Sequence, residues 1–199
     1  MSRERWDERY GTEELKWSAD PNDFLVEEVD SLAPGRALDI ACGQGRNAVW
    51  LASKGWRVTG VDFSRVGLAK AQRLAADRGV EVTWVEADAV AWLPPAASFD
   101  LVIVMYLHLP AEQRRQVLAH AASALAPAGV LLAVGHDTSN LLEGAGGPQD
   151  PAVLYGPEEI AECLPGLEIE RAERATRSVV TDTGEATAVD ARVRALRPF

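Results

Sequence analysis

The sequence predicts a single α/β domain with a doubly wound, mostly parallel seven-stranded sheet that ends in an antiparallel hairpin. Two observations predict this fold. From about residue 36, short apolar segments alternate with longer segments of helical periodicity, a rhythm typical of right-handed βαβ crossovers. The end of the chain differs, because two long segments of alternating apolar and polar residues flank a turn at Gly184, which predicts a terminal hairpin.

The strands are predicted from runs of apolar and β-branched residues that stop at glycine or polar residues. They cover residues 37–41, 57–62, 80–88, 99–106 and 129–137, and the hairpin strands cover 167–180 and 186–197. Helices are predicted at residues 45–55, 65–78, 110–125 and 157–164. Ser64 is the expected N-cap of the second helix, Gly55 and Gly79 are expected helix ends, and Pro127 prevents the third helix from continuing.

Two segments show no regular periodicity. Residues 6–24 carry aromatic side chains among charges, and residues 137–156 are rich in glycine and proline. Long irregular segments in compact domains are usually functional. We therefore expect one domain over residues 1–199, in which residues 1–35 form an N-terminal helical cap or lid, 36–199 the sheet core, and 137–156 a lid loop.

The charge balance disfavours several kinds of partner. The 199-residue chain has 20 Lys and Arg against 30 Asp and Glu, a net charge of -10, which argues against nucleic acid and anionic membrane surfaces. The apolar segments are far shorter than the ~20 residues of a membrane-spanning helix. The N-terminus is charged from its third residue, so we expect a cytoplasmic protein. The two cysteines predict no disulfide framework, and no spacing predicts a metal site.

The most informative segment is LDIACGQGRN, residues 38–47, at the junction of the first predicted strand and helix. Ligands of open parallel sheets bind beyond the carboxyl ends of the strands, and Gly43 and Gly45 let the backbone approach a ligand closely. The segment also fits G-x-G-x-x-A, with Ala48 last, which permits a nicotinamide-dependent oxidoreductase. A tight turn without any ligand is a further alternative.

Three carboxylates accompany this turn: Asp39 inside the first strand, and Asp62 and Asp88 at the tips of the second and third. A buried carboxylate such as Asp39 needs a donor or a cation. Asp62 is placed to accept ribose hydroxyls and Asp88 to accept an exocyclic amine, although a helix cap and a turn residue are the alternatives. Together they favour a ligand with an amine, a ribose diol and a positive charge over a dinucleotide pyrophosphate.

With these residues the chain resembles the class I S-adenosylmethionine-dependent methyltransferases, which share a Rossmann-like fold. D-x-A-C-G-x-G at residues 39–45 corresponds to the family's E/D-x-G-x-G-x-G, with Ala41 where glycine is commoner. VTGVDFS corresponds to the ribose-binding strand end, EAD to the adenine-contacting turn, and FDLVIVMYLHL to the fourth strand. The segments CGQGRNAVWLA, WDERY and PNDFL resemble the small branch that includes the tellurite-resistance methyltransferases. The late basic and histidine residues of those enzymes find no match here, so the substrate stays open.

The resemblance, which runs from about residue 36 to the end of the chain, implies a site for S-adenosyl-L-methionine, with S-adenosyl-L-homocysteine as its product. Asp39 would hold the ammonium group of the cofactor, Asp62 its ribose, and Met105 would lie under the sulfonium. The implied cofactor-binding residues are Asp39, Ala41, Gly43, Gly45, Arg46, Asn47, Asp62, Phe63, Ser64, Asp88, Ala89, Met105 and Leu107, with Tyr10 and Trp17 as aromatic side chains that close over the site.

Four polar residues keep two interpretations each. Arg46 would pair with Asp39 or reach an anionic substrate, and Asn47 would contact the cofactor or satisfy amides of the first helical turn. His108 and His136 follow the fourth and fifth strands, so each is a candidate catalytic base or a structural hydrogen-bonding group.

The sequence thus predicts an enzyme, monomeric or homodimeric, that transfers a methyl group from S-adenosylmethionine to a small-molecule acceptor by in-line displacement. An NAD(P)-dependent oxidoreductase and a catalytically silent cofactor-binding module are the alternatives. A soft nucleophile such as a thiolate needs no base, whereas an oxygen or nitrogen nucleophile would use one. The sequence leaves the identity of the acceptor open.

Overall fold

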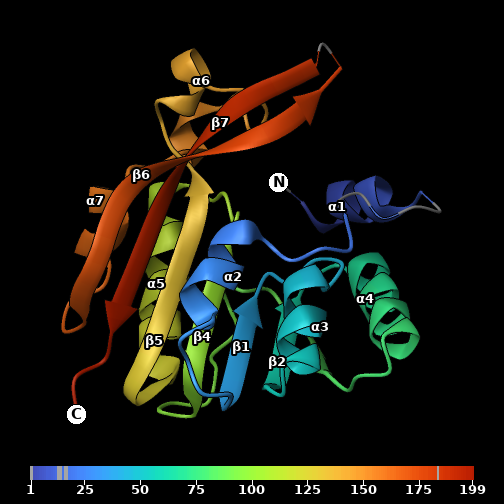
Figure 1. Cartoon of the computed structure of the whole chain (residues 1–199), viewed down its shortest axis with the longest axis vertical. Helices are drawn as coiled ribbons and strands as arrows, with labels where there is room; N and C mark the ends of the chain where they lie inside the picture. The colour runs from blue at the N-terminus through green and yellow to red at the C-terminus, as the bar shows by residue number, and fades with distance from the viewer. Residues whose placement is uncertain (1, 13–14, 16–17, 183) are drawn as a thin grey trace.

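One seven-stranded sheet runs through the protein in the computed structural model, which describes residues 2–12, 15, 18–182 and 184–199 (Figure 1). Its order is β3-β2-β1-β4-β5-β7-β6. The strands are β1 (Arg36–Ile40), β2 (Arg57–Asp62), β3 (Thr83–Glu86), β4 (Phe99–Met105), β5 (Leu125–His136), β6 (Glu168–Thr181) and β7 (Gly184–Leu196). The first five are parallel, and β7 runs antiparallel to both β5 and β6. The predicted fold class, including the terminal hairpin, is confirmed.

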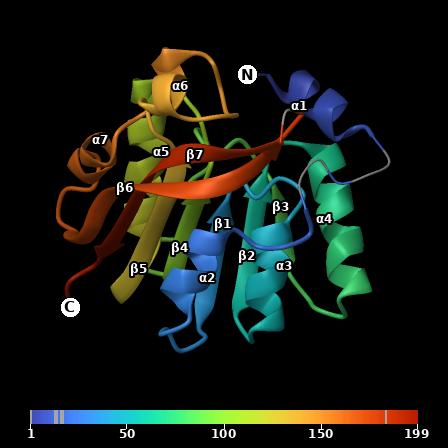
Figure 2. The same cartoon turned by 45° about the horizontal axis from the view of Figure 1, so that its top comes forward.

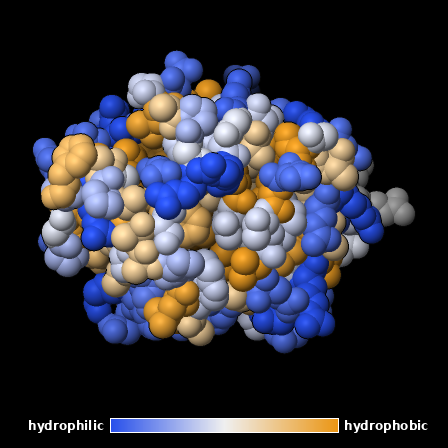
Figure 3. All heavy atoms as spheres, turned by 90° about the horizontal axis from the view of Figure 1, so that it is seen from below, coloured by the Kyte–Doolittle hydropathy of each residue, from blue (hydrophilic) through white to orange (hydrophobic). Residues whose placement is uncertain are grey.

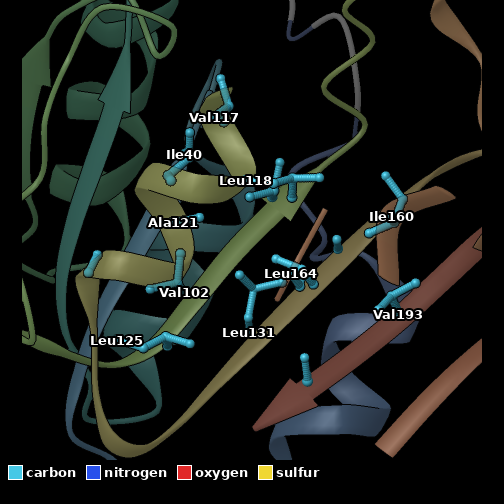
Figure 4. Packing of buried hydrophobic residues seen from close by; sticks show 14 of the residues in the cluster. Ile40, Val102, Val117, Leu118, Ala121, Leu125, Leu131, Ile160, Leu164 and Val193 are labelled. Atoms are coloured by element: carbon cyan, nitrogen blue, oxygen red, sulfur yellow. The ribbon is translucent and has the colours of Figure 1, made fainter. Parts of the chain in front are cut away.

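The α-helices are α1 (Arg3–Tyr10), α2 (Asp23–Val29), α3 (Arg46–Ser53), α4 (Arg65–Asp77), α5 (Ala111–Ala124), α6 (Asn140–Glu143) and α7 (Pro157–Glu162). They cover both faces of the sheet because successive strand residues enter different apolar clusters. In β4, Val102 and Val104 pack with α5 and α7, as Figure 4 shows for Val102. Leu101 and Ile103 pack instead with α2 and α3.

The first and fourth strands end one residue earlier than predicted, for the same reason. Ala41 and Tyr106 have φ values of 58° and 57°, so each turns the chain out of its strand in the left-handed region. Non-glycine residues rarely adopt this conformation. The φ value of Ala41 gives a physical reason why glycine is the commoner residue at that position of the resembling family.

Two strand predictions are wrong in their bounds. β5 begins at Leu125 rather than at residue 129, because Pro127 lies in an irregular stretch where the pairing register with β4 shifts between Phe99 and Leu101. A proline is tolerated in a strand at such an irregularity. β3 covers only four residues, which pair with the last four of β2, so the flanking residues of the predicted strand 80–88 have no partner strand.

The terminal hairpin extends past the end of β5. β7 pairs with β5 only from Leu196 to Asp190, whereas it pairs with β6 along its whole length. The free part of the hairpin reaches out above the carboxyl ends of the central strands (Figures 1 and 2). Residues 137–147 follow its edge, since the Asp137 and Ala145 amides donate to the carbonyls of Val189 and Thr187. The segment 137–156, predicted to be irregular, contains α6 and a short 3₁₀ helix (Pro151–Val153).

The opposite end of the molecule, where the parallel strands begin, has a mixed surface. Hydrophobic side chains are scattered there among hydrophilic ones (Figure 3). Among the described residues, every helix is too short or too polar to cross a lipid bilayer.

Candidate active site

The turn between β1 and α3 has the conformation that its glycines predict, but the two glycines serve different contacts. Gly43 and Gly45 have φ values of 56° and 79°. A Cβ atom on Gly45 would lie 2.6 Å from the Cβ of Ala71 in α4, so this position is required by packing. A Cβ atom on Gly43 would lie 2.7 Å from the Tyr10 hydroxyl, so Gly43 is the glycine that opens toward the N-terminal cap.

Asp39 presents a buried carboxylate oxygen without a partner. The residue is 1% exposed, and its Oδ2 atom has no hydrogen bond among the described residues. Burial, together with the nearby charge of Asp62, raises the pKa of Asp39 to about 8. A buried unpaired acceptor is costly, and a cation or a donor from a ligand would remove that cost. The ammonium group of S-adenosylmethionine fits this requirement.

Asp62 ties the glycine turn to the end of β2. Its Oδ2 atom accepts from the Gly43 amide at 2.8 Å, and its Oδ1 atom accepts from the Ser64 amide at 2.8 Å. Burial raises the pKa of Asp62. Each carboxylate oxygen has a second lone pair, which leaves acceptor capacity for ribose hydroxyls. The neighbouring Ser64 is the α4 N-cap, because its Oγ atom accepts from the Gly67 amide.

The predicted adenine side is more open. Asp88 is exposed and its Oδ1 atom accepts from the Val90 amide at 2.9 Å, the geometry of a turn residue. Phe63 and Ala89 are partly buried at the ends of β2 and β3. These three residues lie at the carboxyl edge of the sheet, next to one another in strand order.

Met105 and Leu107 lie on opposite sides of the sheet. Met105 packs in the cluster with α2 and α3. Leu107 packs with α5 and lines an enclosed apolar cavity of about 10 Å³ behind Tyr155, too small for more than one water molecule. The structure therefore does not bring the two side chains together under one ligand.

The N-terminal helix α1 lies against the site. Tyr10 is 5% exposed and its ring would contact a Cβ atom on Gly67 at 3.1 Å. Burial and the charge of Asp62 raise the pKa of Tyr10. Asp7 accepts a hydrogen bond from the Ser64 hydroxyl, which holds α1 on the start of α4. Trp17, the other predicted aromatic lid residue, lies outside the described residues.

The first two residues of α3 do not form the local contacts that were predicted as alternatives. Asn47 accepts from the Asn22 backbone amide at 2.9 Å, so it fastens the N-cap of α2 to α3. Arg46 forms no direct hydrogen bond or ion pair with any described residue, but it interacts electrostatically with Asp39 and partly offsets the rise in the pKa of that carboxyl. Burial lowers the pKa of Arg46. Its guanidinium group is therefore available to an anion such as the carboxylate of S-adenosylmethionine.

A second polar cluster lies at the ends of β4, β5 and β7. His136 Nδ1 lies 3.1 Å from Asp190 Oδ1. Asp190 Oδ2 accepts from the Tyr106 hydroxyl and from Arg177 Nε, both at 2.7 Å. His108 Nε2 accepts from the His136 backbone amide at 3.1 Å, and burial lowers the pKa of His108 to about 4.

Sequence reasoning named the two histidines and missed their partners. Asp190 stands directly opposite His136 in the antiparallel pairing of β5 and β7. The alternating residues of the two strands could be recognised in the sequence. Which residues face each other across the strand pair cannot be read from one sequence. Arg177 and Tyr106 meet only because the hairpin folds back over β4.

Comparisons with known proteins agree with this geometry. Residues 37–129 match a family model described as a methyltransferase domain. The demethylmenaquinone methyltransferase of Thermus thermophilus is 36% identical over 121 residues, which are 60% of this chain and 53% of that protein. The chain thus spans about half the length of this curated relative.

Two solved structures share the fold over nearly the whole chain. One is described as the conversion of a disulfide bond into a thioacetal group during echinomycin biosynthesis. It has a TM-score of 0.80 at 24% identity, and the match covers 98% of this chain and 93% of that chain. TehB from Haemophilus influenzae has a TM-score of 0.73 at 17% identity and covers 98% of this chain and 66% of its own. The fold, the sequence match and the buried acidic turn agree: residues 37–129 match a methyltransferase domain, within the fold shared by class I S-adenosylmethionine-dependent methyltransferases.

Proposed function

We propose that this protein transfers the methyl group of S-adenosylmethionine to a small-molecule acceptor. The observation that carries the proposal is the partnerless Oδ2 atom of Asp39, buried beside the glycine turn. A cationic ligand removes the cost of that atom and favours its ionised form, whereas a pyrophosphate brings no positive charge to it. Bound S-adenosylmethionine supplies an electrophilic methyl group that is reactive without further activation.

The chain's own residues would bind and orient the ligands. Asp39 would accept from the ammonium group, Arg46 would bind the carboxylate, and Asp62 would accept from the ribose. Tyr10 would exclude water from the turn, since its ring is already buried against Gly43 and Gly67. Orientation and water exclusion are the main contributions a protein makes to such a displacement.

Three considerations support a small molecule as the acceptor. The net charge of -10 disfavours a nucleic acid, which binds through a cationic face. The hairpin and the segment that follows its edge extend above the carboxyl ends of the central strands (Figures 1 and 2), which favours a small substrate over a large one. The Thermus relative is named for demethylmenaquinone, a small molecule of this kind.

Calorimetric titration with S-adenosylmethionine, S-adenosylhomocysteine and NADH tests the proposal. At pH 7 Asp39 holds a proton, because its pKa is about 8, and a bound cation would displace it. We expect release of close to one proton per cofactor in buffers of different ionisation enthalpy, and affinity that rises about 50-fold from pH 6 to pH 8.

Asp39→Asn should abolish the proton release and weaken binding. Asp100→Asn is the matched control, because Asp100 pairs with Arg36 at the other end of the sheet and should leave both quantities unchanged. Binding of NADH in place of S-adenosylmethionine would establish the oxidoreductase alternative. Cofactor binding without transfer to any acceptor in a radiolabelled-methyl assay would favour the silent module.

A further inference from the structure

We propose that His136, oriented by Asp190, is the proton acceptor of this site, and that the methyl acceptor is therefore a hydroxyl compound of phenol-like acidity. The inference rests on the proposed methyl transfer and specifies its nucleophile. It is carried by the polar cluster at the ends of β4, β5 and β7, which the cofactor does not need for its own binding.

The pairing of His136 with Asp190 fixes the imidazole. His136 Nδ1 and Asp190 Oδ1 are 3.1 Å apart. Both atoms are buried and neither forms a hydrogen bond with a described residue, so each is the polar atom available to the other. Asp190 is fully buried. A carboxylate beside Nδ1 holds the proton on that nitrogen and leaves Nε2 as the lone-pair nitrogen.

Asp190 is kept ionised by the groups around it. Burial alone would raise its pKa, but the hydrogen bond from His136, the charge of Arg177 and the hydrogen bond from Tyr106 hold the pKa of Asp190 below its usual value. Burial raises the pKa of Tyr106, so its hydroxyl stays a donor. The carboxylate therefore accepts from Tyr106 and Arg177 through Oδ2, lies beside His136 through Oδ1, and has no proton to give to Nδ1.

His136 rather than His108 has the free nitrogen. No described residue forms a hydrogen bond with His136 Nε2, whereas His108 Nε2 accepts from the His136 backbone amide. The rings of the two histidines are stacked with centroids 5.4 Å apart, and the Tyr106 ring lies 5.2 Å from His136. His108 and Tyr106 thus support the position of the His136 ring.

The cluster borders the cofactor crevice through Tyr106. Both Arg46, at the glycine turn, and Arg177, on the hairpin, interact electrostatically with Tyr106 and with each other. Arg177 donates through Nε to Tyr106 and Asp190, and its two terminal nitrogens have no acceptor among the described residues. Two positive side chains beside one base repel an ammonium acceptor and stabilise an oxyanion.

This chemistry selects the nucleophile. A thiol is already a few per cent thiolate near pH 7 and needs no base. A phenol, with a pKa near 10, needs one. The acceptor O–H bond breaks as its proton passes to His136 Nε2, and a new O–C bond forms to the methyl group. The S–C bond breaks with its electron pair left on sulfur, which gives the methyl ether, S-adenosylhomocysteine and a protonated His136 that returns its proton to water.

The first test reads the imidazole directly and needs no turnover. Nitrogen-15 NMR of the full chain, free and saturated with S-adenosylhomocysteine, should show His136 with the proton on Nδ1. The signals that disappear in His120→Ala belong to His120 and are set aside. In Asp190→Asn, the hydroxyl of Tyr106 and Nε of Arg177 still donate to the amide oxygen. The amide NH₂ then faces Nδ1, and the proton should move to Nε2.

The second test measures methyl transfer to phenol, thiophenol and aniline, which differ only in the reacting atom. We expect transfer to phenol and a loss of about 10²- to 10⁴-fold in kcat for His136→Ala and Asp190→Asn. Affinity for S-adenosylhomocysteine should stay within about threefold, since neither residue contacts the glycine turn.

Three results would overturn the inference: a proton on Nε2 in the unaltered protein, an Asp190→Asn variant with an unchanged tautomer, or transfer to thiophenol but not to phenol. If none of the three acceptors reacts, the tautomer measurement decides. If the chain fails to bind S-adenosylmethionine, the proposed function fails, while the tautomer in the free protein still tests the histidine pair.

Discussion

Replacing Asp39 with asparagine should make the ligand-free protein more stable at pH 7. The carboxyl has a pKa of about 8 in the folded state against an ordinary value of 3.8, because it is buried and lies near Asp62. Between these two values the folded state binds one proton more than the unfolded state. Stability therefore falls as pH rises, by ~1.4 kcal/mol per pH unit.

At pH 7 the accumulated cost is about 4 kcal/mol, which is the difference between pH 7 and the ordinary pKa multiplied by that slope. Asparagine removes this cost but buries an amide NH₂ group at the position of the partnerless Oδ2, for ~1–3 kcal/mol. The expected net gain is about 1–3 kcal/mol, in the direction opposite to the effect on cofactor binding.

Urea unfolding of both proteins at pH 5, 6, 7 and 8 measures the effect. The difference in unfolding free energy between variant and original should grow with pH, since contributions from all other groups cancel. Asp100→Asn should show no such growth, because Arg36 lowers the pKa of Asp100 and its titration ends below this range. Parallel stability curves for Asp39→Asn and the original protein would refute the reasoning.

Two other predictions concern the roof and its attachment. In Gly147→Ala, the new Cβ atom would lie 2.6–2.8 Å from the His136 ring at a φ of 76°, so we expect at least a tenfold loss of kcat on phenol with unchanged cofactor affinity. Gly146→Ala, with a φ of 75° and open space around it, controls for backbone strain. In Glu28→Ala, the carboxylate that pairs with three hairpin arginines is lost, and urea unfolding should show a cost of ~3–5 kcal/mol. Glu173→Ala removes a half-exposed ion pair with Arg171 and should cost under ~1 kcal/mol. Equal costs for the Glu28 and Glu173 variants would contradict the explanation from a buried network.

Most of the fold could be predicted because its signals are local. Alternating apolar segments, Ser64 at a helix start and Gly55 at a helix end each depend on a few neighbouring residues. The errors arise where distant pairing decides the outcome. Pro127 stops the helix as predicted, yet the chain pairs again at once with β4 through a shifted register, which no local rule gives.

The site divides in the same way. Asp39, Gly43 and Asp62 belong to two neighbouring βα turns, so motif and spacing were enough to bring them together. Asp190 and Arg177 come from the hairpin. The contact of Asp190 with His136 and that of Arg177 with Asp190 depend on a strand register fixed by packing. The role of Gly45 was also hidden, because its close neighbour Ala71 lies in α4.

The part of β7 beyond its pairing with β5 has a consequence for engineering new specificities. Asp190 is the β7 residue nearest the tip that pairs with β5, whereas the β7 residues closer to the tip, 184–189, pair with β6. Adding or removing the same number of residues in β6 and β7 at the tip would change the part of the hairpin above a substrate. The pairing of His136 with Asp190 would keep its register. Grafting tips from other proteins of this fold is therefore a modular way to alter which molecules are admitted while the chemistry below is preserved.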